Sequence, residues 1–480
     1  MNSMLPRCFH LAMVLLFLCV PGKNIARGAT SGADAVRFSP AAEAAADTLR
    51  LSLDEAVEMA VKNNSSLRVA RREIEKSEWA RKENRAALLP AVSATGAYNR
   101  VVKKQVMALT MGGETTRIAV GTDNSYYGGF NFSLPLIAPT AWETVKKAEL
   151  DMEAAVVAAM VSENALVQQV RQTYFGILLA RESKRVLQQA YDLALFNARM
   201  VEQKFEKGAV SEYDKLRAEV RVKNQKPPLV AAQLSEELSC MKLRVLLGED
   251  PESPIAFSGS IGDYAKEMVA VAGYAKEMVV TDSGSLLQGV DKNPELLALE
   301  TQSRLLLQSE KMVKAAYLPT LSASGNYQWT SLNDDFKIGS YRWTPYSTVG
   351  LSLNVSLFDG GQKSMRLKQL RLSRESVDER AGELQRGLNL EVRGALMSMQ
   401  NALEELESNR AGVEGAEKAY TISSKRYDTG AGTLLELNDS EMTLTQSRLA
   451  YQQSIYNYMM AKTALEKASG EYTNLYESNN

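Results

Sequence analysis

The chain has 480 residues, of which 56 are basic and 57 acidic, and 45% are hydrophobic. The balanced charge argues against a nucleic-acid partner, which favours an excess of basic side chains. With 24% charged residues, the composition also excludes a disordered chain and a bundle of membrane-spanning helices.

Residues 1–28 are predicted to be a secretory signal peptide. Arg7 precedes an apolar core over residues 9–20, and Gly28 ends a small-residue pattern that fits a cleavage site. The apolar core is shorter than a membrane-spanning helix. Lipidation of Cys19 is the less favoured alternative, because the residue before it is a large leucine.

Loss of the signal peptide removes His10, Cys8 and Cys19, so the mature chain keeps Cys240 and no histidine. A serine–histidine or cysteine–histidine pair and an imidazole metal site are then excluded. Carboxylate chemistry is not excluded, but the commonest general base is missing. We expect no catalytic residues, no metal and no cofactor. Cys240 is expected to be a buried small hydrophobe.

The rest of the chain is a tandem duplication. Residues 86–98 (AALLPAVSATGAY) align with residues 315–327 (AAYLPTLSASGNY), and eight of the 13 positions are identical. Asn64 aligns with Asn293 at the same offset. Further along, the offset is smaller, because the first copy has extra residues in the loop between its two predicted strands. The chain is therefore predicted to use one architecture twice.

The duplication sets the expected domain boundaries. They are a signal peptide over residues 1–28, an N-terminal tail over 29–48, a first repeat over 49–248, a connector over 249–290, a second repeat over 291–470 and a C-terminal tail over 471–480. Each repeat is expected to contain a helix, two strands and two long helices.

Each repeat is predicted to begin with a helix. In the first, Ser52 and Glu55 form a capping-box pattern, and the helix is expected to run to Leu89. The segment Thr140–Lys207 contains no proline and one glycine, which predicts one helix about 100 Å long. Hydrophobic residues at a spacing of seven continue through this helix and its second copy, which indicates coiled-coil packing.

Four segments are predicted to be strands because apolar residues occupy every second position. These residues are Val92, Ala94, Gly96 and Tyr98; Phe130, Phe132, Leu134 and Leu136; Leu321, Ala323, Gly325, Tyr327 and Trp329; and Leu351, Leu353, Val355 and Leu357. Serine, asparagine and threonine predominate between them, so each strand has one apolar and one uncharged polar face.

In a membrane barrel, aromatic residues near the strand ends would form a girdle; these are Tyr98, Tyr327 and Trp329, with Tyr126, Tyr127 and Trp343 nearby. Each hairpin, taken alone, favours an ordinary half-buried hairpin of a soluble protein. Four strands fall short of the about eight that close a barrel, so a barrel would need strands from several chains.

Each long helix is predicted to turn back at a motif of small residues. Gly208 and Gly430 suit a left-handed C-cap, and Ser211 and Thr433 suit the N-cap of the next helix. Pro227–Pro228 are expected to interrupt and kink the first returning helix.

This order of segments resembles the TolC-like outer membrane efflux proteins. The resemblance rests on the duplicated A-A-x-L-P-x-x-S-A-x-G-x-Y segment, the two strand pairs and the turns at residues 205–211 and 427–433, and it covers about residues 49–470. It implies a mainly α fold with a membrane β-barrel portion. Three chains would give four strands each to a 12-stranded barrel, which a trimeric α-helical barrel continues.

The resemblance also implies function and partners. The chain would be a passive, non-enzymatic exit duct for efflux or type I secretion, placed in the outer membrane of a Gram-negative envelope and extending into the periplasm. Its partners would be two further copies, outer-membrane lipid, a periplasmic adaptor protein and an inner-membrane transporter. The adaptor would contact the turn residues Gly208, Ala209, Gly430, Ala431 and Gly432.

In the family, acidic residues after the turns close the periplasmic aperture. Asp214, Glu436 and Asp439 match these positions, and Tyr427 resembles the tyrosine that latches the closed state. Gly432 stands where some members have a basic latch residue. The three acids are equally explained as helix N-terminal acids that the macrodipole favours, and the two explanations are compatible.

Two other classes of protein stay open. One is a periplasmic coiled-coil adaptor without a pore, although such a protein would carry one helical hairpin and not two complete repeats. The other is a secreted glycosidase with paired carboxylates, although no compact pocket fold is indicated. Drug efflux, metal efflux and protein secretion all stay open, although the absence of histidine and the single cysteine of the mature chain weigh mildly against a dedicated metal-binding role.

Overall fold

The computed structural model describes residues 49–111, 114–266, 268, 289–337 and 341–470. The expected signal peptide, both tails and half of the connector lie outside these residues, as do Cys8, His10 and Cys19. None of the helices in the described ranges combines the length and hydrophobicity of a membrane span.

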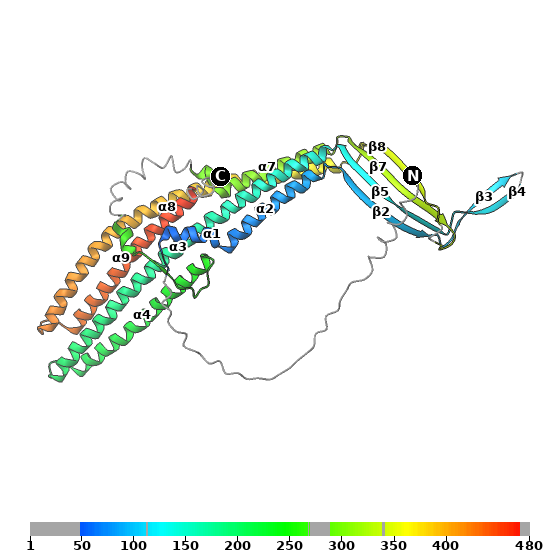
Figure 1. Ribbon diagram of the computed structural model, residues 1–480. Helices are drawn as coiled ribbons and strands as arrows, with labels where there is room; N and C mark the ends of the chain where they lie inside the picture. Colours follow the sequence, from blue (N-terminus) through cyan, green and yellow to red (C-terminus); the bar gives the residue numbers. More distant parts are fainter. Residues whose placement is uncertain (1–48, 112–113, 267, 269–288, 338–340, 471–480) are drawn as a thin grey trace, which may run out of the picture. The chain divides into compact units, whose positions relative to one another are not determined.

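The expected order of elements is present twice (Figure 1). The first repeat consists of β1 (Leu49–Leu51), α1 (Leu53–Asn63), α2 (Ser65–Ala86), β2 (Ala91–Arg100), β3 (Gln105–Met111), β4 (Glu114–Val120), β5 (Asn124–Ile137), α3 (Pro139–Glu206) and α4 (Glu212–Leu246). After β6 (Ile255–Phe257), the second consists of η1 (Val290–Lys292), α7 (Pro294–Ala315), β7 (Thr320–Asn333), β8 (Thr344–Asn354), α8 (Gln362–Asp428) and α9 (Leu434–Ala468).

The first repeat differs from the prediction in two places. The extra loop residues form an added antiparallel hairpin, β3–β4. The single helix expected from Ser52 to Leu89 is wrong: Asn64 has an extended backbone (φ −59°, ψ 134°) and divides it into α1 and α2. The expected capping box of Ser52 and Glu55 is confirmed at the start of α1.

Asn64 and Asn293 hold equivalent junctions in the two repeats. Oδ1 of each accepts a hydrogen bond from the N–H two residues further on, at 2.9 Å, and so caps α2 or α7. Nδ2 of Asn64 donates to the carbonyl of Leu246 at 2.8 Å, and Nδ2 of Asn293 donates to those of Lys467 and Ala468 at 3.2 Å. One buried side chain therefore joins the start of a short helix to the end of a returning helix.

Four strands form one antiparallel sheet in the order β2-β5-β7-β8 (Figure 1). The register places Val92 opposite Phe132, Phe132 opposite Gly325, and Gly325 opposite Val349. Because directly paired residues share a face of the sheet, the predicted apolar series lie on one common face. On the other face, Nδ2 of Asn326 donates to Oδ1 of Asn131 at 2.7 Å.

The register corrects the prediction in three details. A bulge between Pro135 and Ile137 leaves Leu136 out of the ladder, and Ile137 takes the place opposite Leu321. Strand β8 ends at Asn354, so Val355 and Leu357 lie beyond it.

The aromatic residues do not all share one face. Tyr127 pairs with Ala97 on the polar face. Tyr98 stacks on Tyr126, with ring centroids 4.8 Å apart, and Trp343 precedes β8. Tyr327 and Trp329, on strand β7, lie on the same apolar face as Tyr98.

The long helices join the repeats. Helix α3 has 68 residues and α8 has 67, so each is about 100 Å long at 1.5 Å per residue. Helix α3 packs along α2 and α4, α8 packs along α7 and α9, and α3 also contacts α7 and α9. The predicted spacing of seven is reflected in burial, as at Val170 and Ile177 of α3 and Val392 and Leu406 of α8.

Two local expectations concern α4. Pro227 and Pro228 do not interrupt it, since the helix is continuous from Glu212 to Leu246, and the expected break is wrong. Proline has a φ that fits a helix, and what the helix loses is the hydrogen bonds of the missing N–H donors.

Cys240 is half-buried against the main core, and burial raises the pKa of its thiol, so the expected burial is confirmed in part.

The double role of Asn293 gives a stability prediction. Asn293→Ala removes the cap of α7 and both bonds to the end of α9, and we expect it to lower the free energy of unfolding by about 2–3 kcal/mol. Asn293→Ser keeps a capping oxygen and loses only the Nδ2 bonds, so its effect should be smaller. Thermal unfolding of the purified protein, followed by circular dichroism, measures both.

Asn84→Ala is the matched control, because within the described residues the Asn84 side chain bonds to a carbonyl of its own helix, four residues back. Equal losses for Asn84→Ala and Asn293→Ala would contradict the junction role.

Candidate functional site at the helix turns

The two helix turns have the predicted backbone. Gly208 and Gly430 have φ of 69° and 79°, a conformation that favours glycine. The N–H of Ala209 returns to the carbonyl of Lys204 at 2.8 Å, and that of Ala431 returns to Arg426 at the same distance. These bonds satisfy carbonyls that the end of a helix leaves without a partner.

Two of the predicted aperture acids take part in capping boxes. Asp214 accepts hydrogen bonds from the N–H and the hydroxyl of Ser211, and Ser211 Oγ accepts the N–H of Asp214. Thr433 and Glu436 form the equivalent pair in the second repeat. The explanation as N-terminal helix acids is therefore confirmed for Asp214 and Glu436. Asp439 lies one turn into α9 and is exposed.

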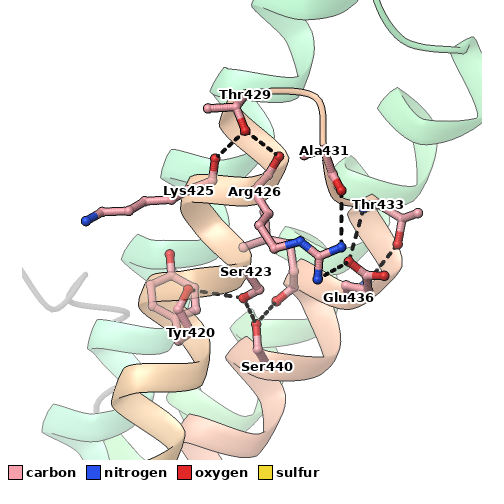
Figure 2. Close-up of polar contacts among 10 residues, drawn as sticks. Tyr420, Ser423, Lys425, Arg426, Thr429, Ala431, Thr433, Glu436 and Ser440 are labelled. Carbon is pink, nitrogen blue, oxygen red and sulfur yellow. Dashed lines mark hydrogen bonds and ion pairs between the residues drawn. The ribbon is translucent and has the colours of Figure 1, made fainter.

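Arg426 supplies the basic group at the second turn (Figure 2). Its Nη2 donates to the carbonyl of Ala431 at 3.2 Å, and Nη1 lies 3.8 Å from the carboxylate of Glu436. A side chain at Gly432 would place its Cβ 3.0 Å from Cβ of Arg426. Gly432 therefore lies directly against Arg426, and the Arg426 side chain contacts the turn that contains this glycine.

A small apolar core holds the two hairpins together above the turns. It contains one or more buried residues from each of the helices α3, α4, α8 and α9: Val201, Ala218, Tyr427, Leu434 and Leu437. Apolar burial at a crossing of four helices fixes the spacing of the two turns.

Lys204 is the polar tie between the hairpins. It lies in the last turn of α3, and its Nζ donates to the carbonyls of Tyr427 at 2.6 Å and Asp428 at 3.0 Å. The same Nζ lies 4.5 Å from the centre of the Tyr427 ring. A cation at the carbonyl end of α8 is stabilised both by these bonds and by the helix dipole.

Tyr427 is brought together with Asp214, which belongs to the other hairpin. Burial raises the pKa of the Tyr427 hydroxyl, and the negative charge of Asp214 adds to this. The Tyr427 side chain is only 5% exposed, and its hydroxyl oxygen has no hydrogen-bond partner within the described part of this single chain.

A second polar group lies deeper between the same helices. Glu441 of α9 is 0% exposed and contacts Asn197 of α3 and Arg221 of α4. Neither this group nor Lys204 was predicted from the sequence, because polar residues in a long amphipathic helix are typical of a solvated face. The described residues include no group of three or more His, Cys, Asp or Glu side chains placed to hold a metal.

Comparison with known proteins gives a family match over both repeats. Residues 56–249 and 288–471 match the family model described as "Outer membrane efflux protein". The chain is similar to the outer membrane protein TolC of Vibrio cholerae, with 21% identity over 81% of this chain and 83% of that protein. It is also similar to the outer membrane protein OprJ of Pseudomonas aeruginosa, with 24% identity over 86% and 83%.

Solved structures share the fold. The CmeC outer membrane channel of Campylobacter jejuni aligns over 95% of this chain and 97% of its own, with a TM-score of 0.70 and 19% sequence identity.

The tie made by Lys204 gives a second prediction. Lys204→Met removes two hydrogen bonds from a charged donor, and we expect it to lower the stability of the packed hairpins by about 1.5–3 kcal/mol. Amide hydrogen exchange near the end of α8 should become faster. Lys207→Met, three residues on and exposed, is the control. An equal effect of both substitutions would show that the loss of one positive charge, and not the loss of the two hydrogen bonds of Lys204, accounts for the change.

Proposed function

Because this chain belongs to the outer membrane efflux protein family and is a non-enzymatic outer-membrane efflux channel, we propose that three copies of it form one passive exit duct. Channels of this family are trimeric and serve in efflux pumps. Here the duct would work with a periplasmic adaptor and an inner-membrane transporter, and that transporter would select the cargo.

The observation that carries the proposal is the open four-stranded sheet. One face is apolar and the other carries uncharged polar side chains, as a barrel with lipid outside and water inside requires. Within the described residues, the edge strands β2 and β8 of this sheet each have one neighbouring strand. Pairing β2 of one copy with β8 of the next would join four strands from each of three chains, twelve in all, into a closed barrel.

The helix turns would form the periplasmic end. Asp214, Glu436 and Asp439 would line the aperture, and Tyr427 would help to hold its closed state. Three acids from each of three chains are nine carboxylates, a ring that attracts cations and repels anions. The capping role of Asp214 and Glu436 supports this placement, because it fixes both carboxylates at the first turn of their helices.

The adaptor would contact the turns themselves. Gly208, Ala209, Gly430, Ala431 and Gly432 present mainly backbone, and the space where a side chain at Gly208 or Gly430 would lie is open. A partner helix can approach such a surface closely, because no side chain separates the two backbones.

Single-channel conductance in a planar bilayer tests the aperture. The triple variant Asp214→Asn/Glu436→Gln/Asp439→Asn neutralises the acids and keeps side chains that can still cap the helices. We expect a cation-preferring wild type, and a variant whose cation-to-anion permeability ratio is lower by roughly threefold or more. Glu237→Gln, an exposed site in the last third of α4 and far along the chain from the turn, is the control and should match the wild type.

The outcomes separate the parts of the proposal. Unchanged selectivity in the triple variant would leave the duct and remove the acidic aperture. No conductance from folded wild-type protein would favour the alternative of a periplasmic adaptor without a pore.

A further inference from the structure

A buried carboxylate joins the two helical hairpins a short distance beyond the turns. Oε2 of Glu441 accepts a hydrogen bond from Nδ2 of Asn197 at 3.0 Å, and its Oε1 lies 3.4 Å from Nη2 of Arg221. Asn197 and Arg221 belong to the first hairpin (α3 and α4), and Glu441 belongs to the second (α9). Each hairpin therefore supplies part of one polar group.

The group is incompletely satisfied. Glu441 is 0% exposed and Asn197 is 3% exposed, while the side chain of Arg221 is 23% exposed. Oδ1 of Asn197 and Nε of Arg221 have no hydrogen-bond partner in the described residues. Burying an ion pair costs desolvation energy that the pair recovers only with good geometry and further hydrogen bonds. This arrangement therefore holds the hairpins together at a cost.

The polar group of Glu441, Asn197 and Arg221 occurs once in the described part of the chain and is not repeated by the internal duplication. At the offset of 222 that relates the turns, Glu219 in α4 corresponds to Glu441 and is exposed. Thr443 corresponds to Arg221, and Ala419 corresponds to Asn197. The glutamate is present in both repeats, but only the second copy is buried and has these partners.

We propose that Glu441, Asn197 and Arg221 form a positioning lock that sets the distance between the two hairpins according to the charge on Glu441. Glu441 lies two residues after Asp439 and five after Glu436 on α9, so a movement at the lock displaces the acids of the aperture. This last consequence rests on the proposed function, whereas the lock itself does not.

The direction of the pH dependence follows from burial. Burial raises the pKa of the Glu441 carboxyl from its ordinary 4.5, and Arg221 and Asn197 oppose this shift by less. Separation of the hairpins would return the carboxyl to water and to its ordinary pKa. The packed arrangement thus binds the proton more tightly, so packing is favoured at low pH and weakens as pH rises through the raised pKa.

The charged and titratable side chains that act on Glu441 are Arg221 of α4 and Tyr420 of α8. Burial raises the pKa of Tyr420, so this hydroxyl stays neutral over the range in which Glu441 titrates. Asn197 of α3 faces the carboxylate but does not titrate.

The experiment measures the distance between the hairpins directly. In the protein without the expected signal peptide (residues 1–28) and with Cys240→Ser, no native cysteine is left. Spin labels are then placed at Gln203→Cys of α3 and Lys425→Cys of α8, both exposed positions. Double electron–electron resonance then gives the distance distribution between about pH 5 and about pH 8. The protein with Glu441 should show a longer-distance population that grows with pH. The ratio of separated to packed hairpins should rise by about tenfold for each pH unit by which packing raises the pKa of Glu441.

Three variants complete the test. Glu441→Gln keeps a hydrogen-bonding side chain without the charge, and the longer-distance population should stay low at every pH. Arg221→Met should shift the midpoint to higher pH, because the buried carboxylate loses its counter-charge. Glu219→Gln, the exposed equivalent, should follow the wild type. A Glu441→Gln profile like that of the wild type, or an equal change in Glu219→Gln, would overturn the lock.

Conductance of the same samples separates the lock from the aperture. If Glu441→Gln abolishes the pH-dependent distance change but conductance does not follow the distance, the lock stands and the proposed aperture fails. If neutralising Asp214, Glu436 and Asp439 changes selectivity while Glu441→Gln has no effect on the distances, the aperture stands and the lock is overturned.

Discussion

The hydrogen-bonding requirement of the sheet edges governs the rest of the structure. In the hydrocarbon of a membrane, each backbone N–H and C=O needs a partner within the protein. The sheet of one chain has four strands, with β2 and β8 at its edges, and this is too few to close on itself. The proposed assembly of several copies would satisfy both edges at once, and the long helices that continue from the strands would then be arranged around the same axis.

The duplication gives each chain two strand pairs and two helical hairpins. Within one chain, single side chains then join the elements of the two repeats. Asn64 and Asn293 repeat one junction between a short helix and a returning helix. At the turns the copies diverge: Arg426 contacts its own turn, whereas Lys204 at the equivalent place reaches across to the end of α8. The two hairpins are thus joined by contacts, such as those of Lys204 and Glu441, that the internal duplication does not repeat.

The sequence was informative where structure depends on neighbours in the chain. Gly208, Ser211 and their second copies form the predicted caps, since capping needs only residues within a few positions. The break at Asn64 was missed because that side chain bonds to Leu246, which lies 182 residues away. Burial of Glu441 was missed for the same reason, because its partner Asn197 lies 244 residues away. The local sequence does not indicate it, since Glu219 at the equivalent position of the first repeat is exposed. The roles of the aperture acids and turn residues stay proposals.

The number of chains in the folded assembly is the most direct test of the account. Native mass spectrometry of the detergent-solubilised protein measures it without reference to cargo or partners. The account predicts a species with the mass of three chains, because the proposed barrel takes twelve strands, four from each chain. A stable, folded monomer would contradict it, because the edges of β2 and β8 would then have no partner strand from another copy. A stable dimer would also contradict it, because two copies supply only eight of the twelve strands.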